Sequence, residues 1–194
     1  MTLVFDFVAN QQMFLGLARQ TAAPLRHALS TRPEPEGLGQ WAMFLRNHDE
    51  LNLGQLTQQE REECFDLYGP DKDMQVFDRG LRRRLAPMLG GDLPRLKMAY
   101  SLMLALPGTP VFWYGDEIGM GDDQSLPERE AVRTPMQWSP DHNGGFSKAP
   151  SDDLPLPVIS GGAFGYETVN AATQVREPDS LFCAIGDMVS ARRS

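Results

Sequence analysis

Three short apolar runs alternate with helical patterns along this chain. The runs lie at residues 3–8, 41–45 and 109–114, and charged or polar residues follow the second and third directly. Apolar side chains on both faces are typical of strands that are covered on both sides in a parallel sheet. The pattern therefore predicts an α/β fold whose strands deliver polar residues to one edge of a sheet.

Helical spacing separates these runs. Asn10 is the expected N-cap of the first helix, and Pro24 is expected to kink or divide it. Thr57 and Glu60 have the spacing of a capping box, in which each side chain satisfies a free backbone donor of the other residue. Apolar periodicity predicts helices over residues 13–29, 57–67, 92–106 and from 179 onward.

A long segment at about residues 115–178 shows no convincing periodicity and is rich in glycine and proline. Loops of such length in compact domains are usually functional or disordered. This one carries four aromatic residues, so we expect a folded loop over the functional edge of the sheet: Trp138, Phe146, Phe164 and Tyr166.

Composition and net charge limit the classes of molecule that this chain is expected to bind. The net charge of −8 disfavours nucleic acid and anionic membrane surfaces, and no run approaches the roughly 18 apolar residues of a membrane span. The basic cluster at residues 79–85 is expected to form local ion pairs. Cys64 and Cys183 lie far apart without metal-ligand spacing, which favours a reduced, cytoplasmic chain. The three histidines lie in unrelated contexts, so we expect no metal site, and we expect no cofactor.

The candidate chemistry follows the second apolar run. His48 and Asp49 lie just beyond residues 41–45, where parallel sheets and barrels bind ligands. One interpretation makes Asp49 a carboxylate that faces substrate, with His48 as a neutral donor beside it. The other, with equal weight from spacing alone, makes Asp49 the cap of a following helix.

Several motifs resemble those of the α-amylase family of glycoside hydrolases. They lie at residues 44–51, 107–122 and 133–140, and within the family they are most similar to trehalose synthases. The resemblance implies a (β/α)₈ TIM barrel, of which this chain would supply the C-terminal portion, about strands 6 to 8 with their helices, as one partial catalytic domain over residues 1–194. It also implies an α-linked glucose disaccharide or oligosaccharide as the ligand.

The same resemblance assigns roles to three residues. Asp49 matches a catalytic carboxylate that grips the glucose hydroxyls and supports the charged transition state, in which those hydroxyls become better donors. His48 and Arg133 match residues that bind the same sugar. Asp116 and Glu117, after the third run, are expected to be structural.

One departure from the family is severe. A retaining glycosidase needs a nucleophilic carboxylate and a general acid about 5 Å apart, and the motifs that carry them are absent from this sequence. We therefore expect a fragment of an enzyme that interconverts maltose and trehalose, inactive alone and associating with itself or with the missing barrel portion. The alternatives are an α-glucosidase fragment, a non-catalytic remnant that binds sugar or a full-length partner, and an unrelated small α/β domain.

Overall fold

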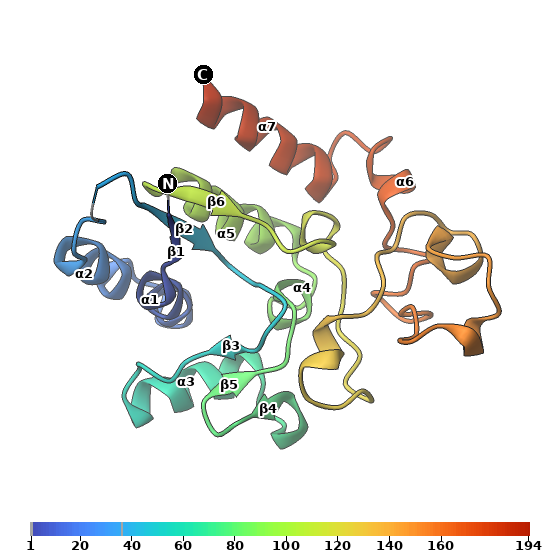
Figure 1. Ribbon diagram of the computed structural model, residues 1–194, viewed down its shortest axis with the longest axis horizontal. Coiled ribbons are helices and arrows are strands. Elements are labelled where there is room, and N and C mark those ends of the chain that lie inside the picture. Colours follow the sequence, from blue (N-terminus) through green and yellow to red (C-terminus); the bar gives the residue numbers. More distant parts are fainter. Residues whose placement is uncertain (1, 36) are drawn as a thin grey trace.

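The computed structural model describes residues 2–35 and 37–194. Its main sheet has three parallel strands in the order β1-β2-β6. They are β1 (Leu3–Phe5), β2 (Gln40–Phe44) and β6 (Thr109–Val111). The three apolar runs therefore form neighbouring parallel strands, as predicted, so their C-terminal ends meet at one edge (Figure 1).

Helices connect the strands in the manner of a strand-helix-strand fold. Between β1 and β2 lie α1 (Phe7–Ala18) and α2 (Ala23–Thr31), which pack against each other, and Pro24 lies in the first turn of α2. Pro24 thus divides the helical pattern as predicted. Before β6 lies α5 (Leu93–Ala105), which packs against the last helix, α7 (Leu181–Arg193) (Figure 1).

The start of α1 differs from the prediction. Asp6 is the N-cap, and its Oδ1 atom accepts a hydrogen bond of 2.8 Å from the backbone nitrogen of Ala9. Asp6 also pairs with Arg32 at 2.6 Å. The predicted cap, Asn10, lies inside the helix and is buried, because the strand ends three residues earlier than its apolar run suggests.

A small antiparallel sheet lies between β2 and α5. Its strands, in the order β3-β5-β4, have only two residues each: β3 (Leu51–Asn52), β4 (Gln75–Val76) and β5 (Gly80–Leu81). The surrounding helices are α3 (Gln58–Tyr68), the 3₁₀ turn Lys72–Met74 and α4 (Leu85–Met88). The predicted capping box at the start of α3 is confirmed, with hydrogen bonds in both directions between Thr57 and Glu60.

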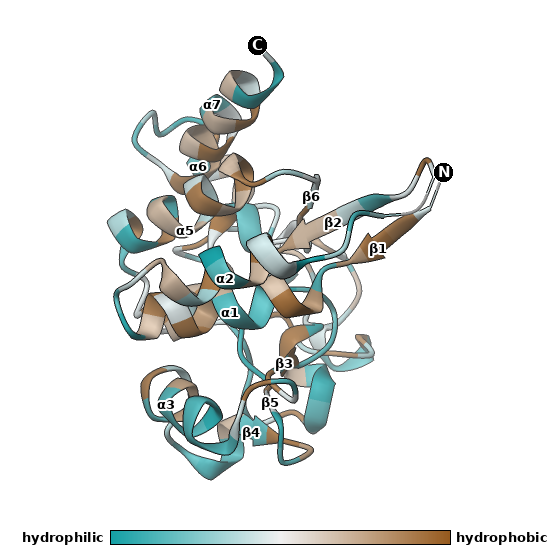
Figure 2. Ribbon diagram, turned by 90° about the vertical axis from the view of Figure 1, so that its left-hand side faces the viewer, coloured by the Kyte–Doolittle hydropathy of each residue, from teal (hydrophilic) through white to brown (hydrophobic). Residues whose placement is uncertain are grey.

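Strand β1 is more exposed than its apolar sequence predicts. Leu3, Val4 and Phe5 are 48%, 44% and 41% exposed, so the expectation of a buried strand is wrong for this part of the chain. Figure 2 shows β1 as a hydrophobic strand at the edge of the sheet, with β2 on its one paired side. The interior of the molecule is instead formed by α1, β2, α3 and α5, which share one core cluster.

The segment before α7 is largely irregular and contains only short helical turns. It follows β6 and contributes a second, smaller cluster of buried apolar residues, which contains Ile118, Met120 and Met136. Among the described residues, no helix has the length and apolar character needed to cross a membrane. The short turns are Asp116–Ile118, Glu128–Val132, His142–Gly145, Ser151–Asp153 and α6 (Ala171–Gln174).

Candidate functional site

The loop that follows β2 holds Asp49 in a fixed backbone position. The Oδ1 atom of Asn47 accepts a hydrogen bond of 2.9 Å from the backbone nitrogen of Asp49, an Asx-type turn. The Nη2 atom of Arg46 donates to the carbonyl oxygen of Asp49 at 2.7 Å, and its Nε atom donates to that of Arg83 at 2.8 Å. Arg46 is buried, and burial lowers its pKa to about 10. Both backbone polar groups of Asp49 are therefore held from within the loop.

The three residues singled out from the sequence meet at this loop. Arg133 donates from Nη2 to Oδ1 of Asp49 at 2.9 Å and from Nε to the carbonyl oxygen of His48 at 2.8 Å. The Nε2 atom of His48 lies 3.7 Å from Oδ2 of Asp49. All three side chains are one third or more exposed, so a ligand in solvent can reach them.

The alternative interpretation of Asp49 as a helix cap is wrong. The element that follows it is the short strand β3, and its side chain pairs with arginine. A carboxylate held by a guanidinium and open to solvent on one side can accept hydrogen bonds from hydroxyl groups.

Two further charged residues belong to this cluster and were missed by the sequence reasoning. Glu50 accepts a hydrogen bond of 2.7 Å from Nε of Arg129, and the same nitrogen lies 3.4 Å from Oδ1 of Asp49. The hydrogen bond to Glu50 raises the pKa of Arg129. Their positions in the sequence, with Glu50 beside Asp49 and Arg129 four residues before Arg133, do not indicate that Glu50 and Arg129 pair with each other.

Aromatic rings form one wall beside His48. Its ring centroid lies 5.6 Å from that of Trp113, which in turn lies 4.3 Å from that of Tyr114. The hydroxyl group of Tyr114 donates to the carbonyl oxygens of Arg133 and Thr134, at 3.0 and 2.8 Å. Residues at the end of β6 thus attach the Arg133 segment to the sheet.

Asp116 has the structural role expected of it. Its Oδ1 atom lies 3.3 Å from Nη1 of Arg84, and both side chains are buried. Burial raises the pKa of Asp116 to about 6, although Arg84 and Arg46 act in the opposite direction. Arg83 pairs with Asp122 at 3.0 Å. Local ion pairing of the basic cluster at residues 79–85 is therefore confirmed.

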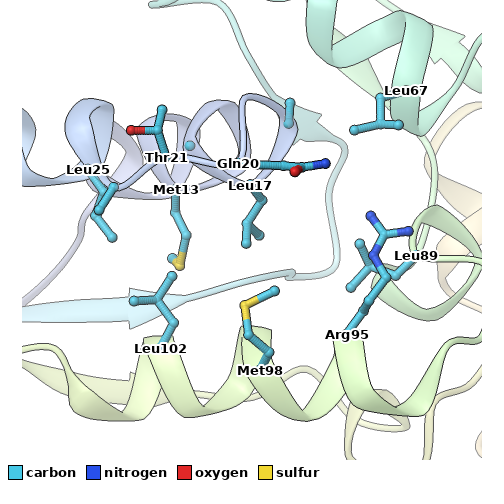
Figure 3. Close-up of a pocket in the computed structure, with 13 residues that line it drawn as sticks. Met13, Leu17, Gln20, Thr21, Leu25, Leu67, Leu89, Arg95, Met98 and Leu102 are labelled. Carbon is cyan, nitrogen blue, oxygen red and sulfur yellow. The ribbon is translucent and has the colours of Figure 1, made fainter.

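Of two cavities in the structure, one is lined by a residue of the candidate site and the other is not. One of about 460 Å³ is lined by Arg133, Glu117, Trp138 and Phe146, among others, and burial raises the pKa of Glu117. A larger one, of about 710 Å³, lies among α1, α3 and α5. Figure 3 shows side chains of α1 and α5 facing each other across it, and neither Asp49, His48 nor Arg133 lines it.

Within residues 2–35 and 37–194, no group of three or more His, Cys, Asp or Glu side chains is arranged to hold a metal ion. Cys64 is buried, Cys183 is half-buried, and both are free thiols.

Comparison with known proteins gives one consistent relationship. The model of the α-amylase catalytic domain matches residues 76–194. A trehalose synthase of Thermus thermophilus is 44% identical over 182 residues, which cover 92% of this chain and 18% of that protein. A trehalose synthase of Pimelobacter sp. (strain R48) is 42% identical over 192 residues, which cover 98% of this chain and 33% of the relative. The chain thus spans a third or less of the length of these relatives.

Solved structures agree on the fold. An α-amylase from H.orenii superposes with a TM-score of 0.65 at 20% identity, over 100% of this chain and 32% of that one. A trehalose-6-phosphate hydrolase from Bacillus licheniformis gives a TM-score of 0.56 at 21% identity, over 98% of this chain and 35% of that one. The chain therefore has the fold of about a third of such a catalytic domain.

Proposed function

Since this chain belongs to the α-amylase catalytic-domain family, we propose that it supplies the sugar-gripping part of a retaining α-glucan enzyme that interconverts maltose and trehalose. The observation that carries the proposal is the convergence of Asp49, His48 and Arg133 at the C-terminal end of β2. Relatives named trehalose synthases, at 42 to 44% identity, support this member of the family over others.

The arrangement suits a glucose ring that flattens during reaction. As the ring approaches an oxocarbenium ion, its hydroxyls become better donors, so a fixed carboxylate binds the transition state more tightly than the ground state. Asp49 is that carboxylate in our proposal, Arg133 keeps it oriented, and His48 donates to the same sugar. The ring of Trp113 beside His48 offers an apolar surface for the C–H face of the sugar.

We further propose that β1, β2 and β6 are the sixth, seventh and eighth strands of the barrel. Their parallel order and the intervening helices support this assignment. The nucleophile and the general acid lie on other strands in such a barrel, so this chain alone binds sugar without turning it over. Its proposed partners are the remaining barrel portion or a second copy of itself, and we expect it to act in the cytoplasm.

Saturation-transfer NMR with glucose and maltose tests the proposal. We expect the native chain to bind maltose and Asp49→Asn to bind it about tenfold or more weakly, since a charge-assisted hydrogen bond is lost. Asp66→Asn, which changes an exposed carboxylate on α3, is the matched control and should bind normally. Equal binding by the native chain and Asp49→Asn would refute the role of Asp49.

Incubation with maltose addresses the proposed lack of turnover. The expected result is neither trehalose nor glucose from the purified chain. Trehalose that forms with the native chain but not with Asp49→Asn would mean that this chain contains its own nucleophile, and the fragment hypothesis would be wrong.

A further inference from the structure

We propose that Arg129 is a positioning residue for Asp49, held in place by Glu50 on one side and by the ring of Phe77 on the other. This inference rests on the sugar-binding role proposed for Asp49. Neither Glu50 nor Arg129 needs to touch the sugar. They have two functions. They leave Arg133 as the main cationic partner of Asp49, and they fix the segment that carries Arg133.

The contact distances show where Arg129 is anchored. Its Nε atom lies 2.7 Å from the Glu50 carboxylate but 3.4 Å from that of Asp49. The Glu50 side chain is 3% exposed, and a buried carboxylate is stable only when it is paired and hydrogen-bonded. Arg129 is therefore committed to Glu50 and makes only a weaker contact with Asp49.

The hairpin between β4 and β5 supports Arg129 from the other side. The guanidinium carbon of Arg129 lies 5.3 Å from the centroid of the Phe77 ring, within the range of a cation–π contact. Phe77 and the next residue, Asp78, both have φ of 55°. This turn conformation normally selects Asn and Gly.

A bulky residue in the left-handed region persists only where its surroundings fix it, and such positions cluster at functional sites. An Asn-Gly turn would suit the hairpin better but would remove the ring beneath Arg129. The strained choice of residue is explained if the Phe77 ring is needed there.

Strand β5 packs closely against the Glu50 side chain. A Cβ atom on Gly80 would lie 2.5 Å from Cγ of Glu50, so only glycine permits this approach. Arg79, beside it, places Nη2 3.8 Å from the Glu50 carboxylate. Glu50 is thus held by β5 and by two arginines, which makes it a rigid anchor.

The anchor matters because Arg129 and Arg133 lie four residues apart, at the turn Glu128–Val132 and directly after it. Without the Arg129–Glu50 pair, this turn would lose one of its attachments to the β2 loop. The buried charge of Glu50 would then compete with Asp49 for Arg133. Either effect disturbs the Asp49–Arg133 hydrogen bond on which sugar binding depends.

A double-mutant cycle on maltose affinity tests the inference. We expect Arg129→Gln to weaken binding about fivefold to tenfold, and to cause no further loss in an Asp49→Asn background, since contacts in one network are not additive. Arg26→Gln, an exposed arginine on α2, is the matched control. Phe77→Leu should weaken binding while Phe77→Tyr, which keeps the ring, should retain it. Additive losses would overturn the inference.

A second readout needs no ligand. In the native chain the Nε–H group of Arg133 donates a hydrogen bond to the carbonyl oxygen of His48. Its proton should therefore exchange slowly with water, which the ¹⁵N–¹H signal of the Arg133 side chain reports. We expect rapid exchange in Arg129→Gln and Glu50→Gln at an unchanged fold. Slow exchange in both variants would refute the positioning role. If the native chain binds no maltose, the proposed function fails, and the Arg133 signal still decides whether Arg129 fixes the segment that holds Arg133 against Asp49.

Discussion

Asn10 of α1 holds the end of β2 through its side-chain amide. Its Nδ2 atom donates to the carbonyl oxygens of Phe44 at 2.8 Å and Leu45 at 3.0 Å. These carbonyls belong to the last residue of the strand and the first residue of the loop that carries Asp49. Helix α1 therefore fixes the backbone at the start of the loop that carries the candidate site.

Replacement of Asn10 should destabilise the fold. Asn10→Ala leaves two buried carbonyls without their partner, and we expect the free energy of unfolding to fall by about 2 to 3 kcal/mol. Urea unfolding followed by circular dichroism measures this change. Gln59→Ala, on the exposed surface of α3, should change stability by less than about 0.5 kcal/mol. Equal effects of the two substitutions would contradict the role of Asn10.

The buried Asp116 should make stability depend on pH in an unusual direction. Its folded-state pKa of about 6 exceeds the value of about 3.9 expected in an unfolded chain, so the native state binds more protons between these values. The contribution of Asp116 is fully present below about pH 4 and is lost as the pH rises through about 6. The loss amounts to about 2 to 3 kcal/mol.

Comparison with Asp116→Asn isolates this contribution from other titrating groups. The urea midpoints of the native chain and the variant are measured from pH 4 to 7.5. The native midpoint minus the variant midpoint should decrease as the pH rises through about 6. A difference that stays constant with pH would show that Asp116 does not titrate there.

Much of the fold was predictable because its signals are local. The strands, the capping box at Thr57 and the break at Pro24 each follow from neighbouring residues. Asn10 was misassigned because a buried amide that bonds to a strand 34 residues away has no local signature. The strands of the small sheet were missed because two residues cannot show a period.

The candidate site was predictable to a similar extent. Asp49, His48 and Arg133 came from a resemblance of motifs, and the structure brings them together. Glu50 and Arg129 could not be assigned a role in that way, since their importance lies in a pair that spans 79 residues of sequence. Spacing along the chain does not show which carboxylate an arginine will choose.

The exposed strand β1 should cause self-association. Its apolar side chains lie at an open edge of the sheet, and such edges pair with other chains unless a charge blocks them. Sedimentation should show species larger than the 21.6 kDa monomer, and Val4→Lys should weaken association about tenfold or more. Val175→Lys, at another exposed apolar residue, is the control. Association that is equally strong in both variants would place the contact elsewhere.

Two glycines should respond in opposite directions to the same substitution. Gly108, just before β6, has φ of 126°, and a Cβ atom there would lie 2.6 Å from the carbonyl oxygen of Trp41 in β2. Gly108→Ala should therefore cost about 2 to 4 kcal/mol, because it combines backbone strain with a clash against the neighbouring strand.

Gly186 has the opposite surroundings, since it lies within the exposed face of α7 and a Cβ atom there would meet no atom within 4 Å. Gly186→Ala should raise stability by about 0.5 to 1 kcal/mol through helix propensity alone. Thermal unfolding of the two variants against the native chain measures both effects. A stable Gly108→Ala variant would contradict the close approach of β2 and β6 in the parallel sheet.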